Sequence, residues 1–297
     1  MDVLNHPMVV VTGKGGVGKS TVAAALALAA ARDGRRVAVG ELGGHARVAG
    51  LLRGSGIDTQ TVDVHHALTE WLATQLPRRL ADLLMRSGAF ASLVAAAPGG
   101  AELISITKLW ELVQHRRWNP NAEPYDLVIV DAPASGHGAA LLRAPRTFAD
   151  IARVGPIGTQ AREVADFLKE DAGFVIVTMP AELPVSETLQ LQQQLPDVDL
   201  VVANAVLPRR FAAGDVAKLQ AASNGGGPAA AAVAHAGRVR AQQGQLQRLR
   251  RGARGPVVTL PWMLDVEPDE LADRLITETG AARRAPRRPG PVDVPSG

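Results

Sequence analysis

The residues whose types and spacing could perform chemistry gather near the start of the chain, in the stretch MVVVTGKGGVGKST at residues 8–21. Gly13 is followed after four residues by Gly18, Lys19 and Ser20, which fits the phosphate-binding pattern G-x-x-x-x-G-K-[ST]. Glycine lets the backbone turn its N–H groups toward phosphate oxygens, and the helix that follows points its positive dipole end at the same anion. Lys19 would reach the β- and γ-phosphates of a bound nucleotide, and the Ser20 hydroxyl would ligate Mg²⁺. The residues predicted to contact the nucleotide at this P-loop are Gly13, Lys14, Gly15, Gly16, Val17, Gly18, Lys19, Ser20 and Thr21.

A second chemical feature is the carboxylate that ends the apolar run YDLVIVD, residues 125–131. Asp131 stands where a strand-end carboxylate would hold the water shell of Mg²⁺ beside Ser20. The residues after it, in DAPASGH, include Gly136, whose backbone N–H would face the γ-phosphate. A loop in contact with the γ-phosphate rearranges on hydrolysis, so residues 131–137 are predicted to form a loop that acts as a switch.

The elements that must position these residues alternate between short strands and helices. A helix is predicted over residues 21–31, ending near Asp33-Gly34, between two buried strands. Such a βαβ unit predicts parallel pairing, and the β-branched strands indicate a doubly wound, mostly parallel α/β sheet with ligands at the carboxyl ends of its strands. The predicted strands are residues 8–11, 36–41, 125–131, 173–179, 199–203 and 257–260.

The domain organisation follows from a long helical pattern at residues 65–117, where apolar residues recur at i, i+3, i+4 spacing with no strand signal between them. We therefore expect a P-loop ATPase core at 1–64 and 118–280, an inserted helical subdomain at 65–117, and a tail at 281–297. The tail is rich in Pro, Gly and Arg, a composition that predicts disorder.

The apolar stripe of the insert has two interpretations. It could form a hydrophobic groove for a client helix, or it could pack the insert onto the core, because amphipathic helices usually bury that face. The residues of the stripe include Trp71, Leu76, Leu80, Met85, Phe90 and Leu93.

Composition excludes several classes of protein. The 297 residues contain no cysteine, so disulfides, thiolate metal sites and cysteine nucleophiles are ruled out. The N-terminus lacks a signal-peptide pattern and no apolar run approaches the roughly 20 residues of a spanning helix, so we expect a cytoplasmic protein without stable membrane insertion. The basic charge is local, because residues 209–254 carry nine Lys or Arg against the single acidic residue Asp215.

Several motifs resemble one family of P-loop ATPases. The lysine directly after Gly13 makes the deviant loop KGGVGKS, which is similar to that of MinD, ParA, nitrogenase iron protein and the arsenical-pump ATPases. The segment at 131–137 resembles the DTAPTGH switch of the arsenical-pump (ArsA) ATPases and of the ATPase that guides tail-anchored proteins to the endoplasmic reticulum. Residues 178–188, TMPAELPVSET, are similar to the proline-rich segment of that family. The match extends from about residue 8 to 275.

This resemblance implies an ATP-hydrolysing, face-to-face homodimer that works as a switch. It implies that Lys14 reaches the partner's nucleotide, that Lys19 and Asp131 take part in catalysis, that Asn204 binds the adenine ring, and that Pro261 and Trp262 contact the base. It also implies that the nucleotide state is coupled to a client-binding lobe in the insert.

Two departures from the family pattern limit what the resemblance implies. Where the pump and targeting ATPases have DPAHS, with an Asp that orients the attacking water, this chain has Glu41-Leu-Gly-Gly-His45, so Leu42 takes the aspartate's place. Glu41 is the nearest carboxylate and the remaining catalytic candidate, but neighbouring strand residues point to opposite faces of a sheet. The second departure is the missing cysteine, which excludes arsenite capture by thiolates and the zinc clasp of the targeting dimer.

Two alternatives to the ArsA-like switch stay open. A ParA- or MinD-like positioning ATPase would cycle on DNA or membrane, and the basic stretch 209–254 would then contact nucleic acid. That stretch has one aromatic residue, Phe211, which disfavours base stacking, so a solvated helix face is the preferred interpretation. The proline-broken tail also disfavours a MinD-type membrane helix. A regulatory module that holds nucleotide with little turnover is the other alternative, and it is kept open by Leu42.

Overall fold

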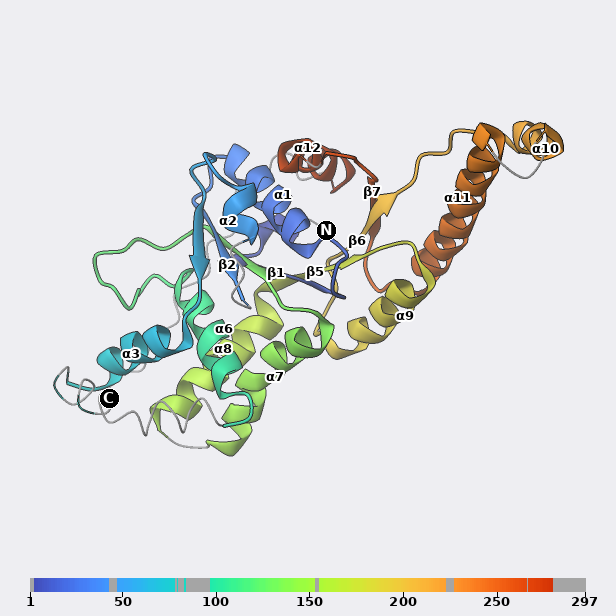
Figure 1. Ribbon diagram of the computed structural model, residues 1–297. Coiled ribbons are helices and arrows are strands. Elements are labelled where there is room, and N and C mark those ends of the chain that lie inside the picture. The colour runs from blue at the N-terminus through green and yellow to red at the C-terminus, as the bar shows by residue number, and fades with distance from the viewer. Residues whose placement is uncertain are drawn as a thin grey trace.

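The computed structural model describes residues 3–42, 47–77, 79, 83, 97–152, 155–222, 227–265 and 267–279. Its centre is a seven-stranded sheet in the order β3-β2-β4-β1-β5-β6-β7, in which every neighbouring pair is parallel (Figure 1). This confirms the predicted doubly wound α/β fold. The strands are β1 Met8–Gly13, β2 Val37–Glu41, β3 Asp58–Thr61, β4 Leu127–Asp131, β5 Ala172–Thr178, β6 Leu200–Val206 and β7 Val257–Pro261.

Both faces of the sheet are covered by helices, because alternate residues of the central strands are apolar and point to opposite sides. Val9 and Val11 of β1 belong to a core cluster on the side of helices α1, α2 and α12. Met8 and Val10 belong to the opposite cluster, beneath α6, α7, α8, α9 and α11. The helices are α1 Lys19–Arg32, α2 Arg47–Leu51, α3 Val64–Gln75, α6 Gly100–Glu111, α7 Ser135–Ile151, α8 Pro156–Glu170, α9 Glu182–Leu191, α10 Ala213–Ala222, α11 Gly227–Gly252 and α12 Pro268–Thr279.

Strand β3 was not expected from the sequence. Its four residues, DTQT, include no large apolar side chain and none of them is buried, because β3 is an edge strand with one neighbour, β2. The hydroxyl of Tyr125 donates a hydrogen bond of 2.7 Å to Asp58 Oδ2 on this strand. Strand pairing and this single side-chain contact therefore define an element that hydropathy does not indicate.

Helices α3 and α6 lie at the two ends of the predicted range of the insert, and they contact each other. The groove interpretation needs exposed side chains, and Trp71 does not fit it: its exposed fraction is 4%, and it packs with Leu68, Leu72 and Ile104 between the two helices. Of the other stripe residues, Leu76 is half-buried beside the same cluster, whereas Leu80, Met85, Phe90 and Leu93 lie outside the described residues. At Trp71 the stripe therefore packs within the insert, between α3 and α6.

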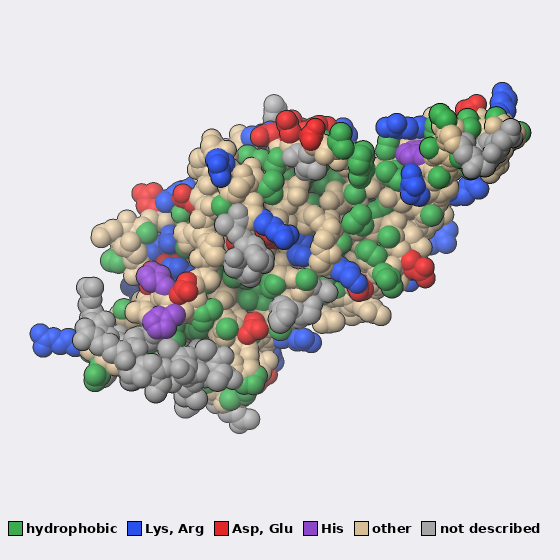
Figure 2. Space-filling view, in the orientation of Figure 1, with side chains coloured by type: hydrophobic (Ala, Val, Ile, Leu, Met, Phe, Trp, Pro, Cys, Tyr) green, Lys and Arg blue, Asp and Glu red, His purple; other side chains and the backbone are tan. Residues whose placement is uncertain are grey.

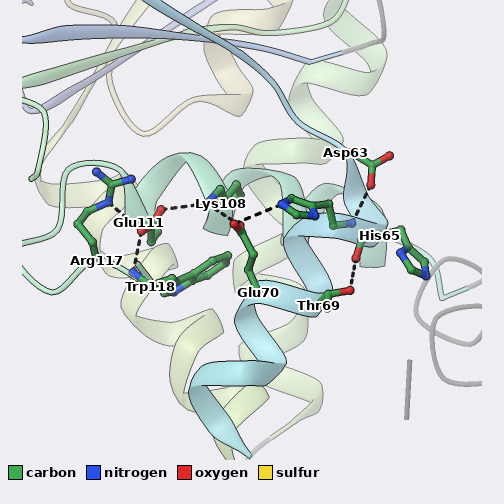
Figure 3. Close-up of polar contacts among 9 residues, drawn as sticks. Asp63, His65, Thr69, Glu70, Lys108, Glu111, Arg117 and Trp118 are labelled. Atoms are coloured by element: carbon green, nitrogen blue, oxygen red, sulfur yellow. Dashed lines mark hydrogen bonds and ion pairs between the residues drawn. The ribbon is translucent and has the colours of Figure 1, made fainter. Parts of the chain in front are cut away.

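A polar network fastens α3 to α6 and to the loop that leads to β4 (Figure 3). Glu111, which is 1% exposed, accepts hydrogen bonds of 2.8 Å from Arg117 Nε and from the Trp118 backbone N–H. Lys108 lies 2.7 Å from Glu70 on α3 and 3.3 Å from Glu111. Since a buried carboxylate must be paired to be tolerated, these contacts hold α3, α6 and the residues that follow α6 together.

Helices α10 and α11 form an arm, residues 213–252, that projects from the end of the molecule beyond β6 and β7 (Figure 1). The buried residues of α11 are Val239, Leu246 and Leu249, and the last two belong to the core cluster under the sheet. Most of α11 is thus exposed within this chain, as its polar composition predicts, and only its C-terminal half packs on the core. No described helix is both long and apolar enough to cross a membrane.

Candidate functional site

The P-loop backbone follows the end of β1 through conformations that exclude larger side chains. Gly13 has φ of +144°, and a Cβ there would lie 2.2 Å from the carbonyl oxygen of Val177. Gly18 has φ of +96°, and a Cβ there would lie 2.3 Å from Asn204 Nδ2. Since nothing can relieve the contact at Gly13 except a backbone shift, glycine is required where the strand turns into the loop.

Lys19 and Ser20 open α1, directly after this turn. Lys19 Nζ donates a hydrogen bond of 2.9 Å to the Lys14 carbonyl oxygen, so the ammonium lies across the mouth of the loop. Burial lowers the pKa of Lys19, an effect opposed by Asp131 and reinforced by Arg47. The site therefore holds a partly desolvated cation where phosphate oxygens would lie, which strengthens its attraction for an anion.

Strand β4 pairs with β1, and Asp131 lies opposite Val11 in this pairing. The Asp131 carboxylate therefore lies close to Ser20, at the start of the helix that follows the P-loop. Ser20 Oγ donates a hydrogen bond of 2.7 Å to Asp131 Oδ2. The other carboxylate oxygen, Oδ1, is buried and has no hydrogen-bond partner within the described part of the chain. Burial raises the pKa of Asp131, whereas Ser20 and Lys19 act to lower it.

These donors fit a magnesium ion. Mg²⁺ prefers oxygen ligands and keeps several waters when a protein supplies one or two carboxylate or hydroxyl groups. The Ser20 hydroxyl and the Asp131 carboxylate supply such a pair, and the partnerless Oδ1 would gain from a water or a cation the contact it lacks. Ser20 and Asp131, which the sequence predicts as the metal residues, are thus brought into contact by the fold.

Glu41 is the register partner of Asp131 on β2, and both point to the α1 side of the sheet. Its carboxylate is 2% exposed and accepts backbone hydrogen bonds from α2, 2.7 Å from Val48 N and 3.3 Å from Ala49 N. Leu42 packs against the opposite core cluster, as the alternation of strand side chains predicts. The structure thus gives Glu41 the task of holding the start of α2, and its predicted catalytic role stays a prediction.

Arg47 is a residue of this site that sequence reasoning missed. It is the first residue of α2, its side chain is exposed, and it is close enough to act electrostatically on both Lys19 and Asp131. The signal in the sequence was a cation six residues after the strand-end Glu41, but the pattern alone could not show that its charge acts on Lys19 and Asp131. Residues 43–46, including His45, lie outside the described residues.

The switch segment after Asp131 differs from the predicted loop, since α7 begins at Ser135. Gly136 falls in the first turn of this helix. The helix start abuts the P-loop, because a Cβ on Gly15 would lie 3.9 Å from Ala134 Cβ, and one on Gly138 would lie 2.9 Å from Thr12 Oγ1. The N-terminal end of a 17-residue helix, with its unpaired backbone N–H groups, therefore faces the phosphate-binding loop.

The predicted base-binding residues lie at the carboxyl ends of β6 and β7. Asn204 Nδ2 donates a hydrogen bond of 2.9 Å to the Val17 carbonyl oxygen, which joins β6 to the P-loop. Pro261 pairs with Val206 in the sheet, and the Trp262 backbone N–H donates to the Val206 carbonyl at 2.9 Å. The indole of Trp262 is 48% exposed beside this edge, so the structure brings Asn204 directly to the P-loop and Trp262 to the neighbouring strand end.

Lys14 forms an ion pair with Glu187 of α9 in the same chain. The two side chains are 41% and 35% exposed, and Glu187 lies in the segment 178–188 that the sequence analysis singled out. The early lysine is therefore held over the proline-rich segment, at the surface beside the P-loop.

This geometry is that of a nucleotide-binding P-loop domain, and comparison with known proteins gives the family. Residues 8–224 match the CobQ/CobB/MinD/ParA nucleotide binding domain, and the chain belongs to that family. ATPase BagA of Mycobacterium tuberculosis is 32% identical over 222 residues, which cover 68% of this chain and 65% of that protein. An uncharacterized protein of Streptomyces coelicolor is 32% identical over 216 residues, which cover 67% of this chain and 51% of that protein. The chain thus spans between about half and somewhat less than two thirds of the length of these relatives.

Proposed function

We propose that this protein is a Mg²⁺-dependent ATPase that works as a homodimeric switch of the ArsA and tail-anchored-targeting type. The observation that carries the proposal is the contact between Ser20 and Asp131, with the partnerless Asp131 Oδ1 beside the Lys19 ammonium. A magnesium ion, or a water that it holds, would give the buried Asp131 Oδ1 the partner that it lacks. Similarity to ATPase BagA supports ATP as the nucleotide.

In this proposal the residues of the chain divide the work on ATP between them. The P-loop amides and Lys19 bind the phosphates and stabilise charge that develops on them. Ser20 and Asp131 hold the Mg²⁺, which would neutralise charge on the β- and γ-phosphates. Arg47 adds a second positive charge from the α2 side, and the start of α7 at Gly136 responds to the γ-phosphate.

Glu41 acts as a positioning residue in this scheme. Its bonds to Val48 N and Ala49 N fix α2, which carries Arg47, next to Asp131. Because the carboxylate is buried and its two oxygens accept bonds from α2, it is poorly placed to take a proton from an attacking water. Turnover in the absence of a water-orienting aspartate would be slow.

The dimer part of the proposal concerns Lys14. To reach the nucleotide of a partner chain, Lys14 must leave Glu187, and an exposed ion pair of this kind contributes only about 0–1 kcal/mol. Lys14 can therefore leave Glu187 for a phosphate group at little cost in free energy. We infer that the pair is the resting position of the lysine and that ATP draws Lys14 across the dimer interface.

The client part of the proposal uses an apolar pocket of about 200 Å³ between the insert and the core helices α7 and α8. Its lining includes Leu68, Trp71, Leu103, Phe148 and Ile157. A volume below the roughly 300 Å³ of typical ligand sites accommodates one or two side chains of a partner helix and not the whole helix. Client binding at this pocket would be read out by nucleotide-dependent retention of tail-anchored substrates.

The direct test is ATP turnover together with the oligomeric state. Purified protein would be assayed for phosphate release with Mg²⁺ and with EDTA, and its mass would be measured by sedimentation with ADP and with ATP. The proposal expects Mg²⁺-dependent release and a larger species with ATP. A chain that binds ATP but releases no phosphate would support the regulatory-module alternative, and a monomer in both nucleotides would overturn the homodimeric switch.

A further inference from the structure

The arm carries a pocket that the nucleotide site does not use. It has a volume of about 510 Å³ and lies between α11, α10 and the loop that precedes α10. Three arginines line it, Arg209 and Arg210 from the loop and Arg240 from α11. The remaining lining residues are Phe211, Ala213, Val216, His235, Ala236, Val239, Gln243 and Gln247.

The charge of this pocket is unbalanced. Arg209, Arg210 and Arg240 are exposed, and none of them has an ion pair or side-chain hydrogen bond within the described part of the chain. Arg254, by contrast, is tied to backbone carbonyls of Gln192, Leu195 and Pro196. Figure 2 shows the Lys and Arg side chains spread over the arm, with hydrophobic side chains between them. The pocket arginines are therefore available to an anionic partner.

The floor of the pocket is apolar, and this feature distinguishes between a nucleic acid and an acidic protein segment as the anionic partner. Val216 and Val239 are the buried residues at the contact of α10 with α11, with Ala213 and Ala236 beside them. The aromatic residue, Phe211, meets His235 edge to face, with ring centroids 6.2 Å apart. A nucleic acid needs stacking platforms or a continuous phosphate track, whereas an apolar floor rimmed by arginines suits an apolar side chain flanked by carboxylates.

The polar rim extends beyond the pocket along α11. Arg240, Gln243, Gln247 and Arg251 are all exposed and stand at i, i+3, i+7 and i+11, so they share one face of the helix. Eleven residues of α-helix cover about 16 Å. That length matches about three turns of a second helix and exceeds what a small anion would use.

We propose that this face of the arm is a docking site for an acidic amphipathic helix of a partner protein. The apolar face of the partner helix would lie on Phe211, Ala213 and Ala236, above the buried Val216 and Val239. Its carboxylates would pair with Arg210 and Arg240, where bidentate geometry favours arginine over lysine. The site lies outside the P-loop and contains none of the residues assigned to ATP or Mg²⁺.

The test compares two pairs of charge reversals on the same arm. The variant R210E/R240E changes the pocket, and the matched control R238E/R248E makes the same change of net charge at exposed arginines that do not line it. Far-UV circular dichroism and ATP binding show that each variant is folded. The probes are three fluorescent 15-residue ligands: an acidic helix-forming peptide with Leu at i, i+3, i+4 and i+7, its sequence-scrambled isomer, and single-stranded DNA.

Fluorescence anisotropy at two salt concentrations gives the result. We expect the amphipathic peptide to bind more tightly than its isomer, R210E/R240E to weaken binding at least about tenfold, and R238E/R248E to weaken it less than about threefold. Equal losses in both variants, equal binding of the two peptides, tighter binding of DNA, or no binding of the amphipathic peptide would overturn the proposal. A change in sedimentation of R210E/R240E without a change in peptide binding would also overturn it, because the occupant would then be a second copy of this chain.

Discussion

Replacing Glu41 separates its structural role from a catalytic one. The structure places its carboxylate on two backbone N–H groups of α2, at 2.7 Å from Val48 N and 3.3 Å from Ala49 N. Glu41→Ala leaves both donors without an acceptor, and since each buried unsatisfied donor costs about 1–3 kcal/mol, the free energy of unfolding should fall by about 2–6 kcal/mol. Glu41→Gln keeps one amide oxygen for Val48 N and should lose about 1–2 kcal/mol.

A positioning role and a catalytic role of Glu41 predict different ATP turnover for these two variants. Removal of a general base lowers the rate by about 10²–10⁴-fold, whereas a positioning residue with a partial substitute loses much less. We therefore expect Glu41→Gln to keep ATP turnover within about tenfold of the wild type, and Glu41→Ala to lose more because α2 and Arg47 are released.

The assay pairs urea unfolding with steady-state phosphate release at saturating Mg-ATP. Glu123→Gln is the matched control, because that carboxylate is 87% exposed, is paired with Arg36 and lies away from the site. Turnover of Glu41→Gln reduced by more than about 100-fold at unchanged stability would refute the positioning role and would restore Glu41 as the base.

Three further predictions follow from particular contacts. Lys14→Ala should leave ATP affinity within about threefold but lower turnover at least about tenfold and abolish the ATP-dependent dimer, as measured by titration calorimetry and sedimentation; full turnover would contradict a role across the interface. Asp131→Asn should remove the Mg²⁺ dependence of ATP binding while Ser20 remains, and Mg²⁺ dependence equal to that of the wild type would show that the metal lies elsewhere. The pKa of His6 is raised above 6.5, chiefly by its 3.2 Å contact with Asp199, so its contribution to stability is complete below pH 6.5 and is lost as pH rises through the folded pKa. His6→Ala should therefore cost about 0.5–1.5 kcal/mol at pH 5.5 and less at pH 8.5, and an equal loss at both pH values in urea unfolding would contradict this linkage.

The sequence could predict those parts of the fold in which local chemistry and burial agree. Strand 125–131 is apolar and ends in a carboxylate, so both the strand and the position of Asp131 follow from the pattern. The P-loop could be predicted equally well from its glycine spacing. The structure shows why that spacing is needed, because at Gly13 the backbone and at Gly18 the Asn204 side chain leave no room for a Cβ. In these segments the same residues specify the element and the site.

The missed parts depend on contacts between segments distant in sequence. Strand β3 is polar and gains its structure from pairing with β2, and the first turn of α7 contains residues that the sequence indicated as a loop. The bonds from Glu41 to α2 depend on which face β2 turns toward Asp131, which register and not composition decides. For the same reason Arg47 could be placed in the site only after the fold was known.

The most direct test of the nucleotide site is a calorimetric titration of ATP into the wild-type protein with Mg²⁺ and with EDTA. The contact of Ser20 with Asp131, and the oxygen of Asp131 that lacks a partner, predict one ATP bound per chain and affinity at least about tenfold weaker in EDTA, which is a difference of about 1.4 kcal/mol. Equal affinity with and without Mg²⁺, or no binding of ATP, would contradict the account of this site.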